Sequence, residues 1–332
     1  MSAVRPVSAI LRVAEAGALP NRLRGGVVAI GNFDGVHRGH QAVLAEAAAI
    51  AAREGRPLIC LTFEPHPRTV FRPAHPVPRL ATARMKARLL GLLDFDAVVE
   101  QPFTLDYAAR SAARFTVETI HTDLGAAHVV VGYDFRFGAR RAGDLALLRA
   151  EGERLGFGVT AVEAFADEGA VVVSSSRIRE DLMNGDVAGA AALLGYRWTF
   201  EGVVEHGAKI GRTLGYPTAN MRLDEDGVLA HGIYAVRLRR ADGSLHDGVA
   251  SFGRRPTFDN GAALFETYLL DFAGDLYGET ASVSLFGFVR GEERFDSAEA
   301  LVARMHRDAD EARAMLASAR PLSALDAAVA FA

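Results

Sequence analysis

The ten residues from Gly31 to His40, GNFDGVHRGH, combine three glycines with two histidines at a point where a strand is expected to become a helix. They follow the apolar run Val27 to Ile30 and open an alanine-rich helical pattern from Gly39 to Arg53. The first N–H groups of a helix lack intrahelical partners and carry a positive dipole, so such a turn binds anions. His37 and His40 are three residues apart, which places both imidazoles on one side of an opening helical turn. The pattern predicts a polyphosphate site.

This decapeptide resembles the HxGH signature of nucleotidyltransferases, which attach the AMP part of ATP to a phosphate and release pyrophosphate. In its full form it is similar to the N-terminal half of bacterial bifunctional riboflavin kinase/FAD synthetases. The resemblance implies that His37 and His40 stabilise the transition state. A helix-capping histidine pair without a ligand is the alternative for these two residues alone. The resemblance also implies that ATP phosphates bind at Gly31, Asn32, Phe33, Asp34 and Gly35.

Two further motifs begin where an apolar strand-like run ends. TFEPHP, Thr62 to Pro67, has prolines on both sides of His66, and prolines stiffen a loop. VGYDFRFG, residues 131–138, places Asp134 beside Phe135, which suits a ring system with one polar edge. Taken alone, the first is an ordinary proline-stiffened loop and the second a core aromatic pair. The family resemblance implies that His66, Asp134 and Phe135 lie near the flavin or the nucleotide.

SSSRIRE, Ser174 to Glu180, follows the last strand-like run of the first half and opens another helical pattern. Hydroxyls and free N–H groups at a helix start bind phosphate, and a guanidinium grips two phosphate oxygens at once. A plain serine cap with surface arginines is the alternative. Together the four motifs match the FAD synthetase module over about residues 25 to 190, which implies that the pyrophosphate end is held by Arg177, Ser175 and Ser176.

The second half carries another candidate phosphate loop, GAKIGRTLGYPTAN, which starts at Gly207. Three residues separate Gly207 from Gly211, and Arg212 stands where a P-loop has lysine, so a P-loop kinase is excluded. The glycines nevertheless allow backbone N–H groups to approach phosphates. Thr218 and Asn220 offer a hydroxyl and an amide oxygen, both hard ligands suited to Mg²⁺. A long hairpin loop is the alternative, but PTAN after GRTLG resembles the signature of riboflavin kinases.

FETYLLDFAGDLYG and VRGEERF continue this resemblance. Glu266 begins the apolar segment ETYLL, where a buried carboxylate is costly without a partner. By resemblance, Glu266 is the base for the ribityl hydroxyl of riboflavin, and Arg290 contacts the flavin. A strand carboxylate facing water is the alternative for Glu266. Two departures from the family pattern affect flavin affinity, since Tyr268 replaces a common histidine and Ser251-Phe252-Gly253 replaces Asn-x-Gly.

The elements that must position these motifs follow from hydrophobic patterning. Up to about Val173, strand-like runs alternate with helical patterns, which is typical of a parallel sheet covered on both faces. Ligands of such sheets bind at the carboxyl ends of the strands. We expect strands at 27–31, 58–63, 97–100, 128–132, 159–164 and 171–173, and helices at 39–53, 82–93, 111–124 and 144–155.

After a helical pair at about 176–184 and 186–194, the pattern changes at Tyr196. Short runs rich in β-branched and aromatic residues are separated by glycine-bearing turns, which suggests an antiparallel barrel or sandwich. A final amphipathic helix is expected from Ser297, as N-cap, to about Leu316. The strands of this half are expected at 198–205, 233–240, 245–252, 264–272 and 281–288.

Composition narrows the class of protein. A chain of 332 residues suits two domains. Its net charge of -4 provides no basic field for nucleic acid. Cys60 is the only cysteine, which excludes an intramolecular disulfide and a Cys-rich zinc site. Because the chain also lacks an apolar run of 18 residues, we expect a cytoplasmic protein whose partners are small molecules, neither nucleic acid nor membrane.

These observations predict an α/β nucleotidyltransferase-like doubly wound parallel sheet over residues 1–190. An antiparallel β-barrel riboflavin kinase domain with a C-terminal helix is predicted over residues 191–332. The resemblance implies that the second half phosphorylates riboflavin to FMN and that the first half adenylylates FMN to FAD, with ATP and Mg²⁺ at both sites. One alternative is another HxGH adenylyltransferase with an accessory barrel, against which PTAN and Glu266 argue. The other is a flavin-binding sensor, which has no need to retain the candidate catalytic residues.

Overall fold

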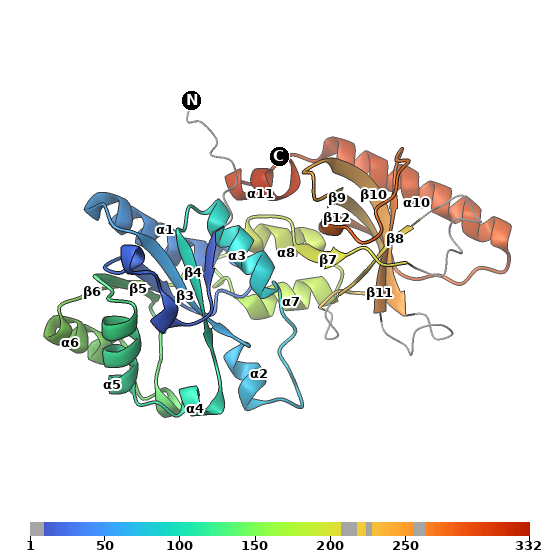
Figure 1. Ribbon diagram of the computed structural model, residues 1–332. Coiled ribbons are helices and arrows are strands. Elements are labelled where there is room, and N and C mark those ends of the chain that lie inside the picture. Colours follow the sequence, from blue (N-terminus) through green and yellow to red (C-terminus); the bar gives the residue numbers. More distant parts are fainter. Residues whose placement is uncertain (1–9, 207–217, 224–227, 255–262) are drawn as a thin grey trace. The chain divides into compact units, whose positions relative to one another are not determined.

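The structure is a computed structural model that describes residues 10–206, 218–223, 228–254 and 263–332. It divides into two compact units (Figure 1). The first unit holds the described residues as far as Val77 together with Ala83–Ser174. The second holds Pro78–Thr82 and the described part of Ser175–Ala332. Each unit has its own sheet, so each half folds around its own core.

Six parallel strands form the sheet of the first unit, in the order β1-β4-β3-β2-β5-β6. The central strand β2, VVAI, is buried along its whole length, as expected for a parallel sheet covered on both faces. The doubly wound α/β fold predicted from the alternating pattern is confirmed. The strands are β1 Leu11–Val13, β2 Val27–Ile30, β3 Leu58–Glu64, β4 Ala97–Pro102, β5 His128–Gly132 and β6 Gly158–Val162.

Helices α1 and α6 of this unit begin and end at capping residues. α6 starts after Asp144, whose carboxylate accepts a hydrogen bond from Leu147 N at 3.0 Å, and it ends before Gly156 at φ 85°. The helices are α1 Arg38–Glu54, α2 Pro67–Phe71, α3 Ala83–Leu92, α4 Leu105–Ala108, α5 Ala112–Arg114 and α6 Leu145–Leu155, with short 3₁₀ turns η1 Ala16–Ala18, η2 Asn21–Leu23 and η4 Ala139–Arg141.

The strand order creates a topological switch point between β2 and β5. From β2 the chain proceeds to β3 and β4 on one side, and from β5 it proceeds to β6 on the other. Ligands of open α/β sheets bind at the carboxyl ends of the strands that flank such a point. The segment Gly31–His40 follows β2 and residues 133–138 follow β5. The fold therefore brings two of the predicted motifs to this edge of the sheet.

The second unit contains a six-stranded antiparallel barrel in the order β7-β12-β9-β10-β11-β8. Its two end strands approach each other where Glu205 N donates to Asn220 O at 2.8 Å. This nearly closed barrel confirms the predicted fold of the second half. The strands are β7 Thr199–Val203, β8 Thr218–Arg222, β9 Gly232–Arg239, β10 Leu245–Arg254, β11 Ala263–Leu269 and β12 Thr280–Arg290.

Alternate residues of each strand fill the barrel. On β9, Tyr234, Val236 and Leu238 have no exposed surface, as the two-residue period of a strand requires. Phe265 on β11 is also fully buried, and its ring centroid lies 4.9 Å from that of Phe200. Since neighbouring strand residues point to opposite faces, Glu266 lies on the outer face of β11.

Among the residues that the structure describes, four helices belong to the second unit, and the last of them is α11 Ala324–Ala330. α7 Ser175–Met183 and α8 Val187–Leu194 form a hairpin, and α8 packs against β12. α10 Ala298–Ser318 packs against β9, β10 and β12. It starts after Ser297, whose hydroxyl accepts from Ala300 N at 3.2 Å, as predicted. In the described parts of the chain, no helix has both the length and the apolar character needed to cross a membrane.

Two expected elements of the first unit differ in the structure. Residues 171–173 do not form a strand. Instead, the Asp167 side chain accepts from Gly169 N and Val171 N at 3.0 Å each, which makes a local turn. The helix expected at 111–124 is divided, because α5 gives way to a π-helix, η3 Phe115–Asp123.

Candidate active sites

The two histidines of the Gly31–His40 turn form a stacked pair. His37 is the N-cap of α1, and its Nδ1 accepts a hydrogen bond from His40 N at 3.3 Å. The imidazole centroids lie 3.6 Å apart with an interplanar angle of 17°. Phe33 contacts the His40 ring edge-on at a centroid distance of 5.3 Å. The predicted placement of both imidazoles on one side of the turn agrees with this geometry.

The surroundings of His40 favour its neutral form. Burial lowers its pKa well below the usual value of 6.5, and the neighbouring His37 and Lys86 lower it further. His40 Nδ1 is buried and makes no hydrogen bond. A neutral imidazole still carries one N–H, so His40 can donate a hydrogen bond to an oxyanion at neutral pH without bearing a charge.

The backbone of the turn is tightly constrained. Gly35 has φ 81°, and Phe33 and Val36 also adopt positive φ values, 48° and 40°. Gly31 approaches Phe33 so closely that a Cβ on it would lie 2.9 Å from that ring. Asn32 is exposed, whereas Phe33 and the next residue, Asp34, are buried. The five residues predicted to bind phosphate thus belong to one fixed loop at the end of β2.

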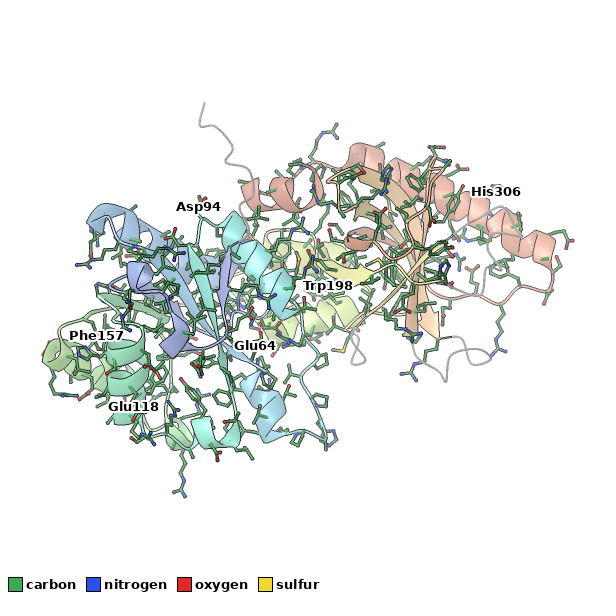
Figure 2. All side chains as sticks on the ribbon, in the orientation of Figure 1. Glu64, Asp94, Glu118, Phe157, Trp198 and His306 are labelled. Carbon is green, nitrogen blue, oxygen red and sulfur yellow. The ribbon has the colours of Figure 1, made fainter. Side chains whose placement is uncertain are left out.

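Glu64 and His66 lie two residues apart at the end of β3, and each has a hydrogen-bonding partner. Glu64, labelled in Figure 2, forms an ion pair with Lys86 of α3 at 2.9 Å. His66 is the N-cap of α2, and its Nδ1 accepts from Arg68 N at 3.2 Å. The His66 ring therefore caps α2, in addition to the flavin or nucleotide contact predicted for it. Lys86 belongs to none of the motifs identified in the sequence.

An aromatic cluster beyond β3 and β4 was also not predicted. The Phe103 ring lies 5.7 Å from Phe63, 5.9 Å from Phe71 and 5.9 Å from Tyr107. Phe71 is 59% exposed. Because these rings come from separate elements, only the folded chain brings them together. They provide an apolar surface after the carboxyl ends of two strands, where a ring-shaped ligand can pack.

The motif after β5 divides between the surface and the core. Phe137 is buried in the core, as one interpretation of the sequence held, and Phe135 stacks on it at a centroid distance of 5.4 Å. Asp134 is exposed. The flavin contacts of Asp134 and Phe135 remain predictions.

The serine-rich motif lies at the start of α7, in the second unit. Ser175 and Arg177 are half-buried, and Ser176 is exposed. Helix initiation at Ser175 agrees with the predicted helix start. Pyrophosphate binding by these three residues remains a prediction.

The candidate kinase residues meet on two neighbouring strands. Thr218 and Asn220 lie on β8, and the register of β8 with β11 pairs Asn220 with Glu266 and Thr218 with Tyr268. Directly opposite residues share one face of a sheet, with Cβ atoms about 4.5 to 5.5 Å apart. Asn220 is buried and Glu266 is half-buried. Hydroxyl, amide and carboxylate oxygens, three kinds of hard ligand, are thus adjacent on the outer face of the barrel.

Arg290, predicted to contact flavin, already has a carboxylate partner. Its Nε and Nη2 donate to the buried Asp308 of α10 at 2.9 and 2.7 Å. The pair ties β12 to α10, which fixes the guanidinium in place. Its flavin contact remains a prediction. Three further predicted phosphate-binding residues lie outside the described residues, namely Gly207, Gly211 and Arg212.

Comparison with known proteins assigns each half of the chain. Residues 19–177 match the family model for FAD synthetase, and residues 194–316 match that for riboflavin kinase. The chain belongs to the bifunctional riboflavin kinase/FMN adenylyltransferase family. It is a bifunctional enzyme of flavin cofactor biosynthesis, with the FAD synthetase module first and the kinase module second.

Individual relatives align over most of their length. Bifunctional riboflavin kinase/FMN adenylyltransferases of Pseudomonas fluorescens and Escherichia coli K12 are 42% and 38% identical to this chain. The first alignment covers 89% of this chain and 94% of the relative, and the second covers 90% and 95%. A crystal structure described as a macrolide-efflux protein from Streptococcus pneumoniae is 29% identical, with a TM-score of 0.81, and covers 92% of this chain and 99% of its own. That description concerns the pneumococcal protein alone.

Proposed function

We propose that adenylylation of FMN takes place at the carboxyl edge of the first sheet, over residues 1–190. The observation that supports this best is the stacked His37–His40 pair at the N-terminus of α1, beside the topological switch point. An FMN phosphate oxygen attacks the α-phosphorus of ATP in line, and pyrophosphate leaves. The reaction needs no covalent nucleophile. The protein's task is to align the two substrates and to stabilise the charge that develops.

In this proposal, His40 and His37 stabilise the charge that develops during the reaction. A neutral His40 donates its N–H to an oxygen of the reacting phosphate as negative charge accumulates there. The loop Gly31–Gly35, before the N-terminus of α1, takes the nucleotide phosphates, as the family resemblance implies. Arg177, Ser175 and Ser176 take the pyrophosphate end, as the family resemblance implies. The aromatic cluster around Phe103 is proposed as a packing surface for the flavin ring, beside Phe135.

We propose that riboflavin phosphorylation takes place on the outer face of β8 and β11, within residues 191–332. The supporting observation is the register that places Glu266 opposite Asn220. Glu266 accepts the proton of the ribityl hydroxyl as the hydroxyl oxygen attacks the γ-phosphorus of ATP, and ADP leaves. Thr218 and Asn220 would hold Mg²⁺, which supplies charge neutralisation on the phosphates when bound. Their oxygens fit such an ion, which usually takes few protein ligands beside phosphate and water.

We also propose that the protein works in the cytoplasm on small molecules and not on nucleic acid. The single buried cysteine and the charge of -4 support this proposal.

A flavin assay tests the proposed function, including the role of Mg²⁺. Purified protein is incubated with riboflavin and ATP, with Mg²⁺ or with a chelator, and the flavins are separated by chromatography. Riboflavin should be converted first to FMN and then to FAD, and both steps should stop with the chelator and resume when Mg²⁺ is restored. Riboflavin that remains unchanged in the presence of Mg²⁺ would contradict the proposal.

A further inference from the structure

Lys86 is a buried ammonium group in the first unit. It lies on α3 with a relative exposure of 3%. A lysine is almost never fully buried unless its charge and its three N–H donors find partners. The need for such partners makes its surroundings informative.

Three oxygen atoms surround the Lys86 ammonium. Its Nζ donates to Asn32 O at 3.0 Å, to Thr62 Oγ1 at 3.0 Å and to Glu64 Oε1 at 2.9 Å. Thr62, which is fully buried, in turn donates its hydroxyl hydrogen to the same Asn32 carbonyl at 3.0 Å. The three acceptors match the three N–H groups of the ammonium, so no donor is left to bind a substrate phosphate.

This network joins the end of β3 to the turn after β2. Asn32 immediately precedes Phe33, whose φ of 48° is uncommon for a residue with a side chain. Such a conformation persists where the surrounding structure holds it. Two hydrogen bonds to the Asn32 carbonyl, from Lys86 and Thr62, provide that restraint a few residues before the His37–His40 pair.

We propose that Lys86 is a positioning residue for adenylyl transfer, which fixes the carbonyl of Asn32 and through it the turn that carries His37 and His40. The proposal rests on the proposed function of this turn. Lys86 itself touches neither substrate. Its loss is therefore expected to misplace the histidines during the reaction and to leave the binding of FMN largely intact.

The direct test is Lys86→Met in the full-length protein, compared with Arg84→Met, which removes an exposed cation from the same helix. A displacement of about 1 Å in an active site costs about a hundredfold in rate. The kcat for FAD formation from FMN should fall by about that factor in Lys86→Met, with nearly unchanged KM for FMN. Arg84→Met should keep the parent rate. Imidazole NMR signals of His37 and His40 should shift in Lys86→Met alone.

A second variant keeps the proposal testable if Lys86→Met does not fold. Thr62→Val keeps the shape of the side chain but removes the hydroxyl that joins Lys86 to Asn32, and Thr62→Ser restores that hydroxyl. The kcat for FAD formation should fall in Thr62→Val and recover in Thr62→Ser.

Two results would overturn the proposal. One is a Lys86→Met protein with the parent kcat. The other is a Lys86→Met protein in which KM rises while kcat is unchanged, which would make Lys86 a substrate ligand. The proposed function fails separately, if the parent protein makes no FAD from FMN or if His40→Ala retains full activity.

Discussion

His40 illustrates how position in the fold sets the chemistry of a residue. Its imidazole is neutral because burial, with His37 and Lys86 nearby, lowers its pKa well below 6.5. The unfolded chain binds a proton at this residue as the pH falls through about 6.5, whereas the folded chain does not. This difference in proton binding stabilises the folded protein above that pH. The stabilisation is lost as the pH falls toward the pKa of His40 in the folded chain.

The stability of the first unit should therefore decrease in mild acid, in part through His40. We expect urea unfolding of the parent protein to show a larger loss between about pH 7.5 and 5.5 than that of His40→Ala. Far-UV circular dichroism of both proteins at the two pH values measures the effect. Equal losses would mean that His40 is not held neutral by the fold.

Asn220 provides a separate prediction for the kinase site. If its amide oxygen binds Mg²⁺, Asn220→Ala should raise the Mg²⁺ concentration needed for half-maximal FMN formation by about tenfold or more, since even indirect support of a metal site is worth that much. FAD formation from added FMN should keep its Mg²⁺ dependence, and serves as the internal control. An Mg²⁺ titration in which both activities shift together, or neither does, would contradict the proposed ligand.

Sequence reasoning at this scale succeeded where chemistry-bearing residues are close together in the chain. His37 and His40 share a helical turn, and Thr218 and Asn220 share a strand face, so spacing alone predicts their proximity. Lys86 escaped such reasoning, because a lone lysine in a helical pattern looks like a surface residue. Its partners become visible only in the folded chain, where Lys86 meets Thr62 and Glu64 of β3 and the carbonyl of Asn32.

Among the elements, α11 Ala324–Ala330 shows how a short helix can be held by one buried carboxylate. Asp326 is fully buried, accepts from Arg197 N at 2.8 Å and forms an ion pair with the Arg197 guanidinium. That guanidinium also lies over the rings of Phe286 and Phe331, at 4.3 and 4.9 Å. This buried ion pair thus joins α11 to the start of the barrel, and Arg239 of β9 adds hydrogen bonds to the carbonyls of Ala328 and Val329.

Removal of this carboxylate should destabilise the second unit strongly. Asp326→Ala leaves a buried, uncompensated guanidinium, which costs about 3 to 5 kcal/mol. The matched control is Asp271→Ala, which removes the carboxylate of the exposed pair with Arg313 and should cost about 0 to 1 kcal/mol. Chemical unfolding of both variants measures the difference. Similar small losses in both would show that α11 contributes little to the fold.

Helices were predicted best where a capping residue marks the end of a periodic hydrophobic pattern. Ser297 accepts the capping hydrogen bond expected of it at the start of α10, and Asp144, expected as the first residue of a helix, is the N-cap of α6. β1 escaped notice because three residues, LRV, are too few to show a period. The change from α5 to the π-helix η3 leaves no sequence signal, since the hydrophobic pattern of both helix types is similar over so short a stretch.

At the scale of the whole molecule, the two units suggest where the chain can be cut. We expect a fragment of residues 175–332 to fold and to convert riboflavin to FMN but not FMN to FAD, because α7 and α8 belong to the second unit. A fragment of residues 191–332 lacks buried residues of this hairpin, such as Leu182 and Val187, each worth about 1.5 to 3 kcal/mol. It should unfold at a lower denaturant concentration.

Circular dichroism, denaturant unfolding and flavin chromatography of the two fragments test this expectation. Equal stability would show that the α7–α8 hairpin does not support the barrel. A folded 175–332 fragment without kinase activity would place part of the kinase site in the first unit.

The proposed function assigns adenylylation to His40 and phosphorylation to Glu266, and a paired assay of two variants separates these two assignments. His40→Ala removes a hydrogen-bond donor worth about 2.7 to 4 kcal/mol to the transition state. Glu266→Gln keeps the shape of the side chain but cannot act as a base, a defect of about 10² to 10⁴ in rate. Each variant is incubated with ATP and Mg²⁺, with riboflavin in one reaction and FMN in the other.

The two variants should show opposite defects. His40→Ala should accumulate FMN from riboflavin and form FAD about a hundredfold more slowly or worse, whereas Glu266→Gln should leave riboflavin unchanged and still convert added FMN to FAD. If either variant lost both activities to the same degree, or if Glu266→Gln phosphorylated riboflavin at the parent rate, the assignment of adenylylation to His40 and of phosphorylation to Glu266 would be contradicted.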